Sequence, residues 1–165
     1  MVNKEAFFSE IFQKNSRKIY HLCYGYTGSS EAADDLMQET FMKVWQNLDK
    51  FRNQSMISTW IYRIAVNTCL SYLRTESRHP KEELTGKIIE DKQEETSDKK
   101  EQTALLYTCI SKLEENERII ITMVLDEIPY PEIAEVSGIS EGNLRVKIHR
   151  IKQKLAALYN SYERI

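Results

Sequence analysis

The stretch YPEIAEVSGISEGNLRVKIHRIKQKL, residues 130–155, decides the fold of the C-terminal part of the chain. It contains a short helix-sized run, a glycine and a longer basic run. Pro131 suits the first position of a helix, and Gly138 can adopt the positive φ that ends one. Ser140 suits the N-cap of the helix that follows. Two helices joined by a tight turn over residues 138–140 predict a helix-turn-helix motif.

The second helix of this motif has an apolar face and a basic face. Its apolar residues recur at the spacing of an amphipathic helix: Leu144, Ile148, Ile151, Leu155 and Leu158. Between Asn143 and Lys154 there are five basic residues and no acid. Such a helix can lie in the major groove, with Lys and Arg on phosphates and Asn or Arg on base edges. An ordinary solvated face is the alternative, but the Pro, Gly and Ser spacing favours DNA binding.

Composition predicts an all-α protein without a catalytic site. The 165 residues include only 5 Gly and 3 Pro, which leaves few hairpin turns. No apolar run approaches the length of a membrane span, and the N-terminus lacks a signal-peptide pattern, so we expect a cytoplasmic protein. The three His and three Cys are scattered, and no catalytic motif is present. We therefore expect no enzyme activity, no cofactor, no metal site, and three buried, reduced thiols.

Apolar periodicity divides the chain into two small helical domains. The first, over residues 1–75, has helical spacing over 7–26, 30–48 and 57–74. The second, over residues 101–165, contains the helix-turn-helix. Between them, residues 76–100 carry few large apolar side chains, and Lys81 to Gln102 hold eight acids against five lysines. This composition predicts a flexible acidic linker that would span ~25–30 Å as a coil, enough for the domains to sit on separate surfaces.

One helix of the first domain carries a polar stripe. Its apolar side consists of Leu36, Met37, Thr40, Phe41 and Val44. The opposite side consists of Asp35, Gln38, Glu39, Met42 and Gln46. Acids and amides around one Met suit the docking of a basic partner helix, although such a stripe is more often simply solvated.

The next helix and the loop before it have groups that suit nucleic acid. The helix is apolar almost all round, and its polar exceptions include a stripe of Arg63, Asn67 and Arg74, which suggests phosphate contact as much as plain surface charge. An aromatic, a basic residue and two amides in the loop could stack on and hydrogen-bond an unpaired base, or form only a polar turn. The loop residues are Phe51, Arg52, Asn53, Gln54, Ser55 and Met56.

Three segments carry a resemblance to a known family. DDLMQETFMKVW (34–45), FRNQSMISTWIYRIAVNTCLSYLR (51–74) and residues 130–155 are similar, in that order, to the motifs of bacterial RNA polymerase sigma factors of the extracytoplasmic-function group, in the sigma-70 family. The resemblance covers about residues 5–75 and 102–158. It implies a chain that binds core RNA polymerase and directs promoter recognition and transcription initiation, while the polymerase supplies the chemistry. The sequence departs from the family pattern at several positions, among them Val66, Ser71, Glu114 and Glu127, where Arg, Asp, Pro and Gly are usual.

The resemblance also implies partners and roles. The partners are core polymerase, through its β′ clamp helices and β flap, promoter DNA and an anti-sigma factor. The residues that would dock on the clamp helices are Asp35, Gln38, Glu39 and Met42. Those that would capture and hold the −10 element are Phe51, Arg52, Asn53, Gln54, Arg63, Asn67 and Arg74. Those that would read the −35 element are Asn143, Arg145, Val146, His149, Arg150 and Lys152.

Net charge suggests how the two domains would act together. At −2 overall, the free chain should bind DNA weakly, because non-specific affinity comes mainly from phosphate neutralisation. We therefore expect polymerase to hold both domains in register on one promoter, which raises avidity without new contacts. The competing interpretation is a stand-alone helix-turn-helix regulator that binds a palindromic operator as a symmetric dimer.

Overall fold

The computed structural model describes residues 3–76 and 96–163, with only the backbone for residues 73–76. These residues confirm the all-α prediction, since they form seven α-helices and one short 3₁₀ helix: α1 (Lys4–Thr27), α2 (Ser30–Asn47), η1 (Leu48–Lys50), α3 (Ile57–Glu76), α4 (Ser97–Ile110), α5 (Glu115–Leu125), α6 (Tyr130–Ser137) and α7 (Glu141–Glu163). Most of the predicted linker lies outside the described residues. Helix α4 begins inside that segment, four residues before the predicted domain boundary.

Local sequence signals account for the helix ends. The side chain of Asn3 accepts a hydrogen bond from the Glu5 N–H at the start of α1, and Ser29 does the same for Ala32 at the start of α2. Helix α1 runs unbroken through the polar residues 13–18, which interrupt its apolar pattern. That stretch contains no Gly or Pro to break the helix, and its side chains are half-buried or exposed.

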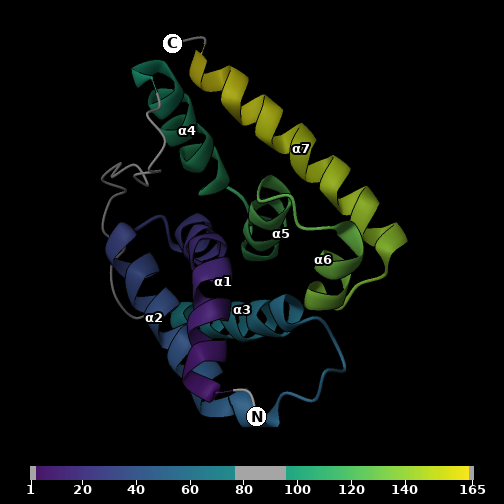
Figure 1. The fold of residues 1–165 in the computed structure, drawn as a ribbon. Helices are drawn as coiled ribbons and strands as arrows, with labels where there is room; N and C mark the ends of the chain where they lie inside the picture. The colour runs from purple at the N-terminus through teal and green to yellow at the C-terminus, as the bar shows by residue number, and fades with distance from the viewer. Residues whose placement is uncertain (1–2, 77–95, 164–165) are drawn as a thin grey trace.

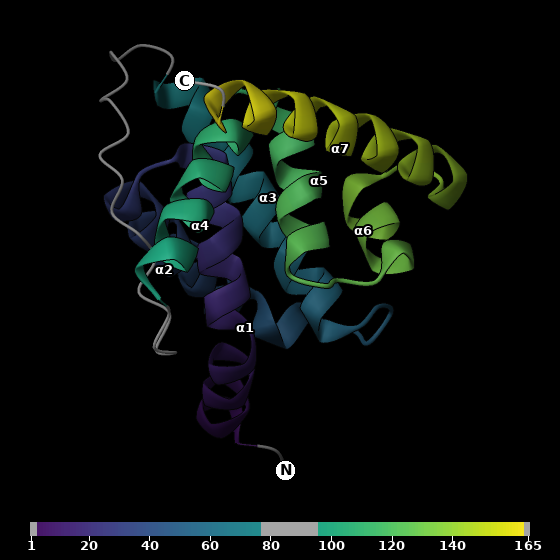
Figure 2. The ribbon, with the colours of Figure 1, turned by 90° about the horizontal axis from the view of Figure 1, so that it is seen from above.

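Helices α1, α2 and α3 form the N-terminal bundle, and α4 to α7 form the C-terminal part (Figure 1). Helix α7 crosses the outer side of α4, α5 and α6, as Figure 2 shows from above. Its predicted apolar face points inward: Leu144, Ile148, Ile151 and Leu155 are buried, and Leu158 is half-buried. No described helix is both long enough and apolar enough to cross a membrane.

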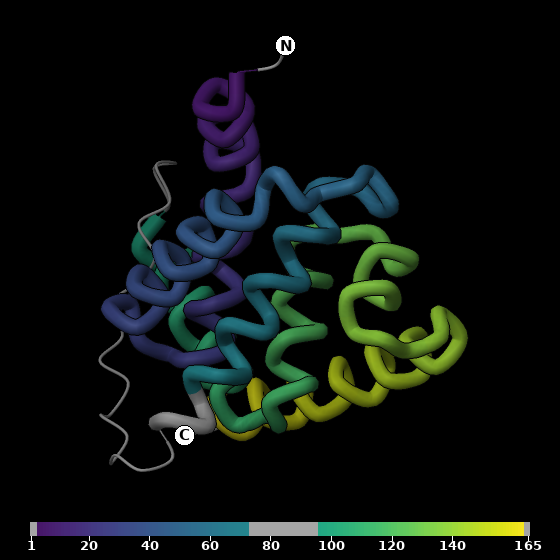
Figure 3. Tube along the Cα trace, turned by 90° about the horizontal axis from the view of Figure 1, so that it is seen from below, coloured from purple at the N-terminus to yellow at the C-terminus, as the bar shows by residue number. Residues whose placement is uncertain are grey.

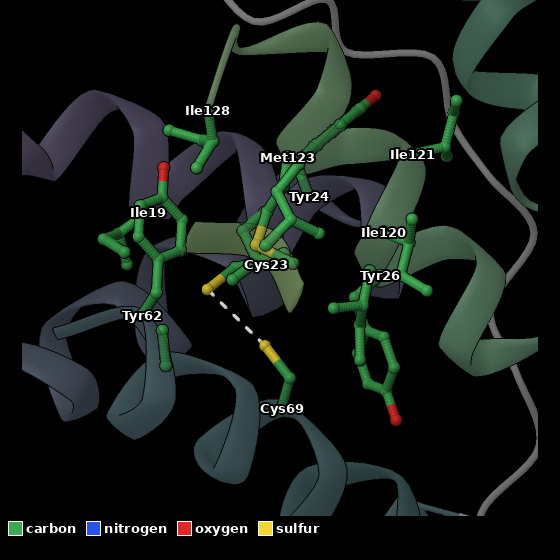
Figure 4. Packing of buried hydrophobic residues seen from close by; sticks show 14 of the residues in the cluster. Ile19, Cys23, Tyr24, Tyr26, Tyr62, Cys69, Ile120, Ile121, Met123 and Ile128 are labelled. Carbon is green, nitrogen blue, oxygen red and sulfur yellow. Dashed lines mark hydrogen bonds between the residues drawn. The ribbon is translucent and has the colours of Figure 1, made fainter. Parts of the chain in front are cut away.

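The two parts pack directly against each other. Helix α5 lies on α1, and α6 lies on α3. The view from below in Figure 3 shows α6 beside α3. Figure 4 shows the shared core, in which Met123 and Ile128 meet Ile19 and Tyr62. The sequence predicts both helical parts, but it gives no sign of this contact, because residues far apart in the chain make it.

The cysteine prediction is confirmed. Cys23, Cys69 and Cys109 are all free thiols, and all three are fully buried. The sulfur atoms of Cys23 and Cys69 lie 3.8 Å apart, between α1 and α3 (Figure 4). They fill the core as small apolar side chains.

Candidate DNA-binding and polymerase-binding surfaces

Helices α6 and α7 form the predicted helix-turn-helix. Gly138 has a φ of 70° and ends α6, and its N–H donates a hydrogen bond to the Ala134 carbonyl at 2.9 Å. The Ser140 hydroxyl then accepts a hydrogen bond from the Asn143 N–H at 3.2 Å and caps α7. Pro131 is the second residue of α6 rather than the first, since the helix begins at Tyr130.

The turn before α6 explains one departure from the family pattern. Glu127 has a φ of 60°, in the left-handed region that glycine adopts without strain. The resemblance implies Gly at this position, and Glu127 adopts the left-handed conformation at a cost of about 1–2 kcal/mol. Backbone hydrogen bonds hold it there: the Glu127 N–H donates to the Val124 carbonyl, and the Ile128 N–H donates to the Met123 carbonyl.

The outer face of α7 is exposed to solvent. Every residue predicted to read the −35 element is exposed: Asn143, Arg145, Val146, His149, Arg150 and Lys152. The Arg145 guanidinium is already oriented, because it lies 5.3 Å from the centre of the Tyr130 ring and its Nη2 is 3.1 Å from Glu141 Oε1. The contact of the Tyr130 ring with the Arg145 guanidinium was not predicted from the sequence, although the aromatic residue at the start of the first helix is a signal for it.

A partly buried ion pair ties α7 to α5. Lys154 Nζ lies 2.8 Å from Glu117 Oε2, and the Glu114 N–H donates to Glu117 Oε1 at 3.2 Å. Burial raises the pKa of the Glu117 carboxyl, but the hydrogen bonds from Lys154 and from the Glu114 backbone lower it by more. The net effect is a carboxyl with a pKa below its ordinary value.

We expect Glu117→Gln to lower the free energy of unfolding by about 1–2 kcal/mol at pH 7. Because the folded pKa is lower than the unfolded one, the carboxylate's contribution is complete above the unfolded pKa and disappears as the pH falls through the folded pKa. Urea denaturation at pH 7 and in acid measures this difference. Glu10→Gln, which removes the exposed pair with Lys14, is the control and should change little. A loss at Glu117 that stays constant into acid would contradict the assignment.

The polar stripe of α2 is exposed as predicted. Asp35, Gln38, Glu39 and Met42 all face solvent, and Met42 is 61% exposed. The apolar side of the same helix is largely buried, with Leu36, Phe41 and Val44 in the core. Within the stripe, Gln38 Nε2 donates to Asp34 Oδ2 at 3.1 Å, and Glu39 pairs with Lys43 at 3.1 Å.

An aromatic groove lies beside this stripe. It has a volume of about 410 Å³ and is lined by Phe8, Gln38, Phe41, Met42, Trp45 and Gln46. The rings of Phe8 and Trp45 meet edge to face, with centroids 5.3 Å apart, and Lys4 Nζ lies 4.4 Å from the Trp45 centroid. Sequence reasoning missed the groove because it assigned Phe8 to the apolar pattern of α1. Trp45, four residues after Phe41 on α2, was the available signal.

The loop between η1 and α3 presents polar side chains next to an aromatic pair. Arg52, Asn53 and Gln54 are exposed, and Asn53 has a φ of 57°, which Asn tolerates well. Phe51 is only half-exposed, since its ring packs on Trp60 with centroids 5.2 Å apart.

One residue of the polar stripe on α3 already forms an ion pair within the chain. Arg63 and Asn67 are exposed, as predicted. However, Arg63 Nη2 lies 2.9 Å from Glu135 Oε1 of α6, so the guanidinium already has an anionic partner within the chain. Arg74 is in the last turns of α3, and its side chain lies outside the described residues.

These surfaces define a class of protein: an all-α chain in which a helix-turn-helix is joined to a second helical bundle that carries an exposed polar stripe. Comparison with known proteins agrees with this class and narrows it. Residues 11–79 match Sigma-70 region 2, and residues 103–155 match Sigma-70, region 4. The chain belongs to the ECF RNA polymerase sigma factors of the sigma-70 family.

Individual relatives support this membership over nearly the whole chain. The ECF RNA polymerase sigma factor SigM of Bacillus subtilis (strain 168) is 29% identical over 157 residues, which are 92% of this chain and 94% of SigM. SigW of the same organism is 30% identical over 161 residues, which are 90% of this chain and 86% of SigW. The sigma factor RpoE from Bartonella quintana, solved in complex with the anti-sigma factor NepR, has the same fold, with a TM-score of 0.77, 19% identity and coverage of 93% of this chain and 96% of RpoE.

Family membership defines the activity. The chain binds core RNA polymerase and directs sequence-specific promoter recognition and transcription initiation. The competing interpretation, a stand-alone regulator, does not account for Sigma-70 region 2 in the N-terminal half.

Proposed function

We propose that three separate surfaces of the chain divide the work of initiation. The α2 stripe docks on the β′ clamp helices of the polymerase, the loop over residues 51–56 and the polar face of α3 hold the −10 element, and α7 reads the −35 element. The observation that carries this proposal is the exposure of polar side chains on helices whose opposite faces are buried. Helices α2 and α7 lie at opposite sides of the molecule, so both are available at once (Figure 1).

Docking on the polymerase combines charge with an apolar anchor. Asp35 and Glu39 suit a basic partner helix, while Met42 and the adjacent aromatic groove give an apolar side chain of the partner a place to bind. Interfaces of this kind concentrate their affinity in a few aromatic and apolar contacts within a polar rim. The β flap is the second polymerase element that we propose as a partner, for the C-terminal half of the chain.

Two groups of hydrogen-bond donors, one on α7 and one on the loop before α3 and on α3 itself, would recognise DNA. On α7, Arg145 and Asn143 are at the N-terminal end of the helix, where a recognition helix meets base edges, and Lys152 is further along, where phosphates are within reach. On the −10 side, exposed amides of Asn53 and Gln54 can hydrogen-bond an unpaired base, and Arg63 and Asn67 can hold the strand. The proposed −10 contacts also include Phe51, Arg52 and Arg74.

We also propose where the chain acts and what controls it. The chain acts in the cytoplasm, with the polymerase, and has no catalytic role of its own. An anti-sigma factor controls it, as the NepR complex of the Bartonella quintana relative suggests. Such a partner would have to cover the stripe of α2 or the DNA-facing sides of α3 and α7 in order to block initiation.

Run-off transcription tests the proposal. Purified core polymerase with the full chain should transcribe a subset of a promoter library, whereas core polymerase alone should not. Arg63→Ala should lower that yield about tenfold or more, because charge-assisted hydrogen bonds to phosphate are strong. Lys100→Ala, which removes an exposed charge on α4, is the control and should leave the yield unchanged. Equal transcription with Arg63→Ala would remove α3 from the proposed DNA surface.

A further inference from the structure

Val146 is an exposed apolar residue in the middle of a basic surface. Its side chain is 52% exposed, whereas the other large apolar residues of α7 are buried or half-buried. Valine is a weaker helix former than the lysine, arginine or alanine that suits a solvated helix position. A single exposed valine is ordinary when only its exposure is considered. The position of Val146 on α7 and the residues around it indicate a more specific role.

Val146 lies at the centre of the outer face of α7. At about 100° per residue, it points nearly opposite to the buried ladder that contains Leu144 and Ile148. The residues three or four positions away on the same face are all exposed: Gly142, Asn143, His149 and Arg150. Three of these four carry polar side chains. An apolar centre is thus surrounded by hydrogen-bonding groups on a helix that has no acid between residues 143 and 154.

A glycine leaves open space in front of Val146. Helical side chains lean toward the N-terminus, so the Val146 methyl groups lie over the turn that contains Gly142. Outside its own helical turn, a Cβ built on Gly142 would find no described heavy atom within 4 Å. The fold therefore does not require glycine at this position, and its small size lets a flat surface come close to the helix. Valine holds its methyl groups in that space, because one rotamer is strongly preferred in a helix.

The chemistry of this patch suits a thymine. In the major groove, only thymine among the four bases presents a methyl group, and apolar side chains contact it there. The polar side chains around Val146 suit the acceptors of neighbouring bases and phosphates. A protein partner suits the patch less well, because one valine offers too little apolar surface to anchor an interface. The occupant that fits is the base-edge surface of a DNA duplex.

We infer that Val146 selects a thymine in the −35 element by contact with its 5-methyl group, in the space that Gly142 leaves open. This inference rests on the proposed role of α7 in reading that element. Arg145 is the preceding residue, but it points about 100° away, toward Tyr130 of α6. The two side chains therefore meet different base pairs, and the thymine is a determinant separate from the base that Arg145 contacts.

A randomised −35 library tests the position of this contact. Core polymerase with the full chain transcribes the library, once with the wild type and once with Val146→Ala. We expect Val146→Ala to flatten one column that contains thymine on either strand, and to lower the yield from the best promoter about three- to tenfold. That column should differ from the one that Arg145→Ala changes. Circular dichroism and the thermal midpoint should stay as in the wild type, because Val146 is exposed and alanine is a good helix former.

Deoxyuridine isolates the methyl group, because it pairs like thymine, keeps the O4 acceptor and lacks only the 5-methyl. Each −35 thymine of the best promoter, on either strand, is replaced in turn. With the wild-type chain, one replacement should weaken promoter binding by the holoenzyme about three- to fivefold, as expected for one methyl group left in water. With Val146→Ala, the two duplexes should bind equally. Gln153→Ala, which shortens an exposed side chain further along the same face, is the control and should keep the full deoxyuridine penalty.

Gly142→Ala tests the open space itself. The added methyl group meets no described atom of another part of the chain, and alanine is the better helix former, so the thermal midpoint should rise slightly. The same methyl group would stand between the helix and the base edge. We therefore expect weaker promoter binding and a smaller deoxyuridine penalty in a chain that is more stable. A full penalty in Gly142→Ala would overturn the role of this space.

The outcomes separate this inference from the proposed function. If deoxyuridine weakens binding by the wild type no more than binding by Val146→Ala, the thymine contact is overturned. A column that Arg145→Ala changes would still support α7 as the reader of the −35 element. If Val146→Ala, Arg145→Ala and Lys152→Ala all transcribe the library like the wild type, the proposed function of α7 fails together with this inference.

Discussion

Charge reversal of the α2 stripe, with Asp35→Lys and Glu39→Lys together, is expected to lower core polymerase binding about 100-fold and to abolish run-off transcription. The physical reason is that two lysines would replace two carboxylates at the proposed interface with a basic partner helix, and like charges across an interface cost several kcal/mol. The variant should fold normally, because both side chains are exposed and the opposite face of α2 carries the packing. Fluorescence anisotropy with labelled core polymerase measures binding, and run-off transcription measures the consequence.

The matched control carries the same change in charge on another helix. Asp98→Lys with Glu101→Lys alters two exposed acids of α4, far from α2 in the fold, and should leave polymerase binding within about twofold of wild type (Figure 1). If both double variants lose affinity equally, overall charge rather than the stripe governs binding. If neither does, the α2 stripe is not the docking surface.

Features that depend on helical spacing could be predicted from the sequence. The apolar ladder of α7 and the two faces of α2 follow directly from residues repeated every three or four positions, and the structure buries and exposes them accordingly. The turn before α7 was also predictable, because Gly138 and Ser140 have local backbone roles that need no tertiary information. These are the parts of the site in which one element of structure suffices for the argument.

The features that could not be predicted from the sequence depend on contacts between residues far apart in the chain. Arg63 meets Glu135, and Gly25 meets Thr122, between residues that no periodic pattern connects. Glycine inside a helix signals a close approach only when the neighbour is known, and otherwise it is simply a weak helix former. The aromatic groove beside the α2 stripe could not be predicted for a related reason. An apolar pattern cannot distinguish a ring in the core from a ring at its edge, such as the 37% exposed Trp45.

On the opposite side of the molecule, Arg145→Ala should reduce transcription from −35-dependent promoters about 10- to 100-fold and relax selection at one base pair, since a specific arginine contact is worth about 1–3 kcal/mol. The Arg145 guanidinium is held over Tyr130 and beside Glu141, so in the proposed role it would meet DNA with its orientation largely set. Run-off transcription on a randomised −35 library measures both yield and base preference.

Lys152→Ala distinguishes base recognition from simple loss of charge. Both substitutions remove one exposed positive charge from α7. A lysine that contacts phosphate should weaken binding evenly across all sequences and lower the salt slope by about one, without changing the preferred bases. Arg145→Ala should instead change the sequence logo at one position. If the two variants produce the same uniform loss, Arg145 contacts the backbone, and base selection in the −35 element must come from other residues of α7 such as Asn143 or His149.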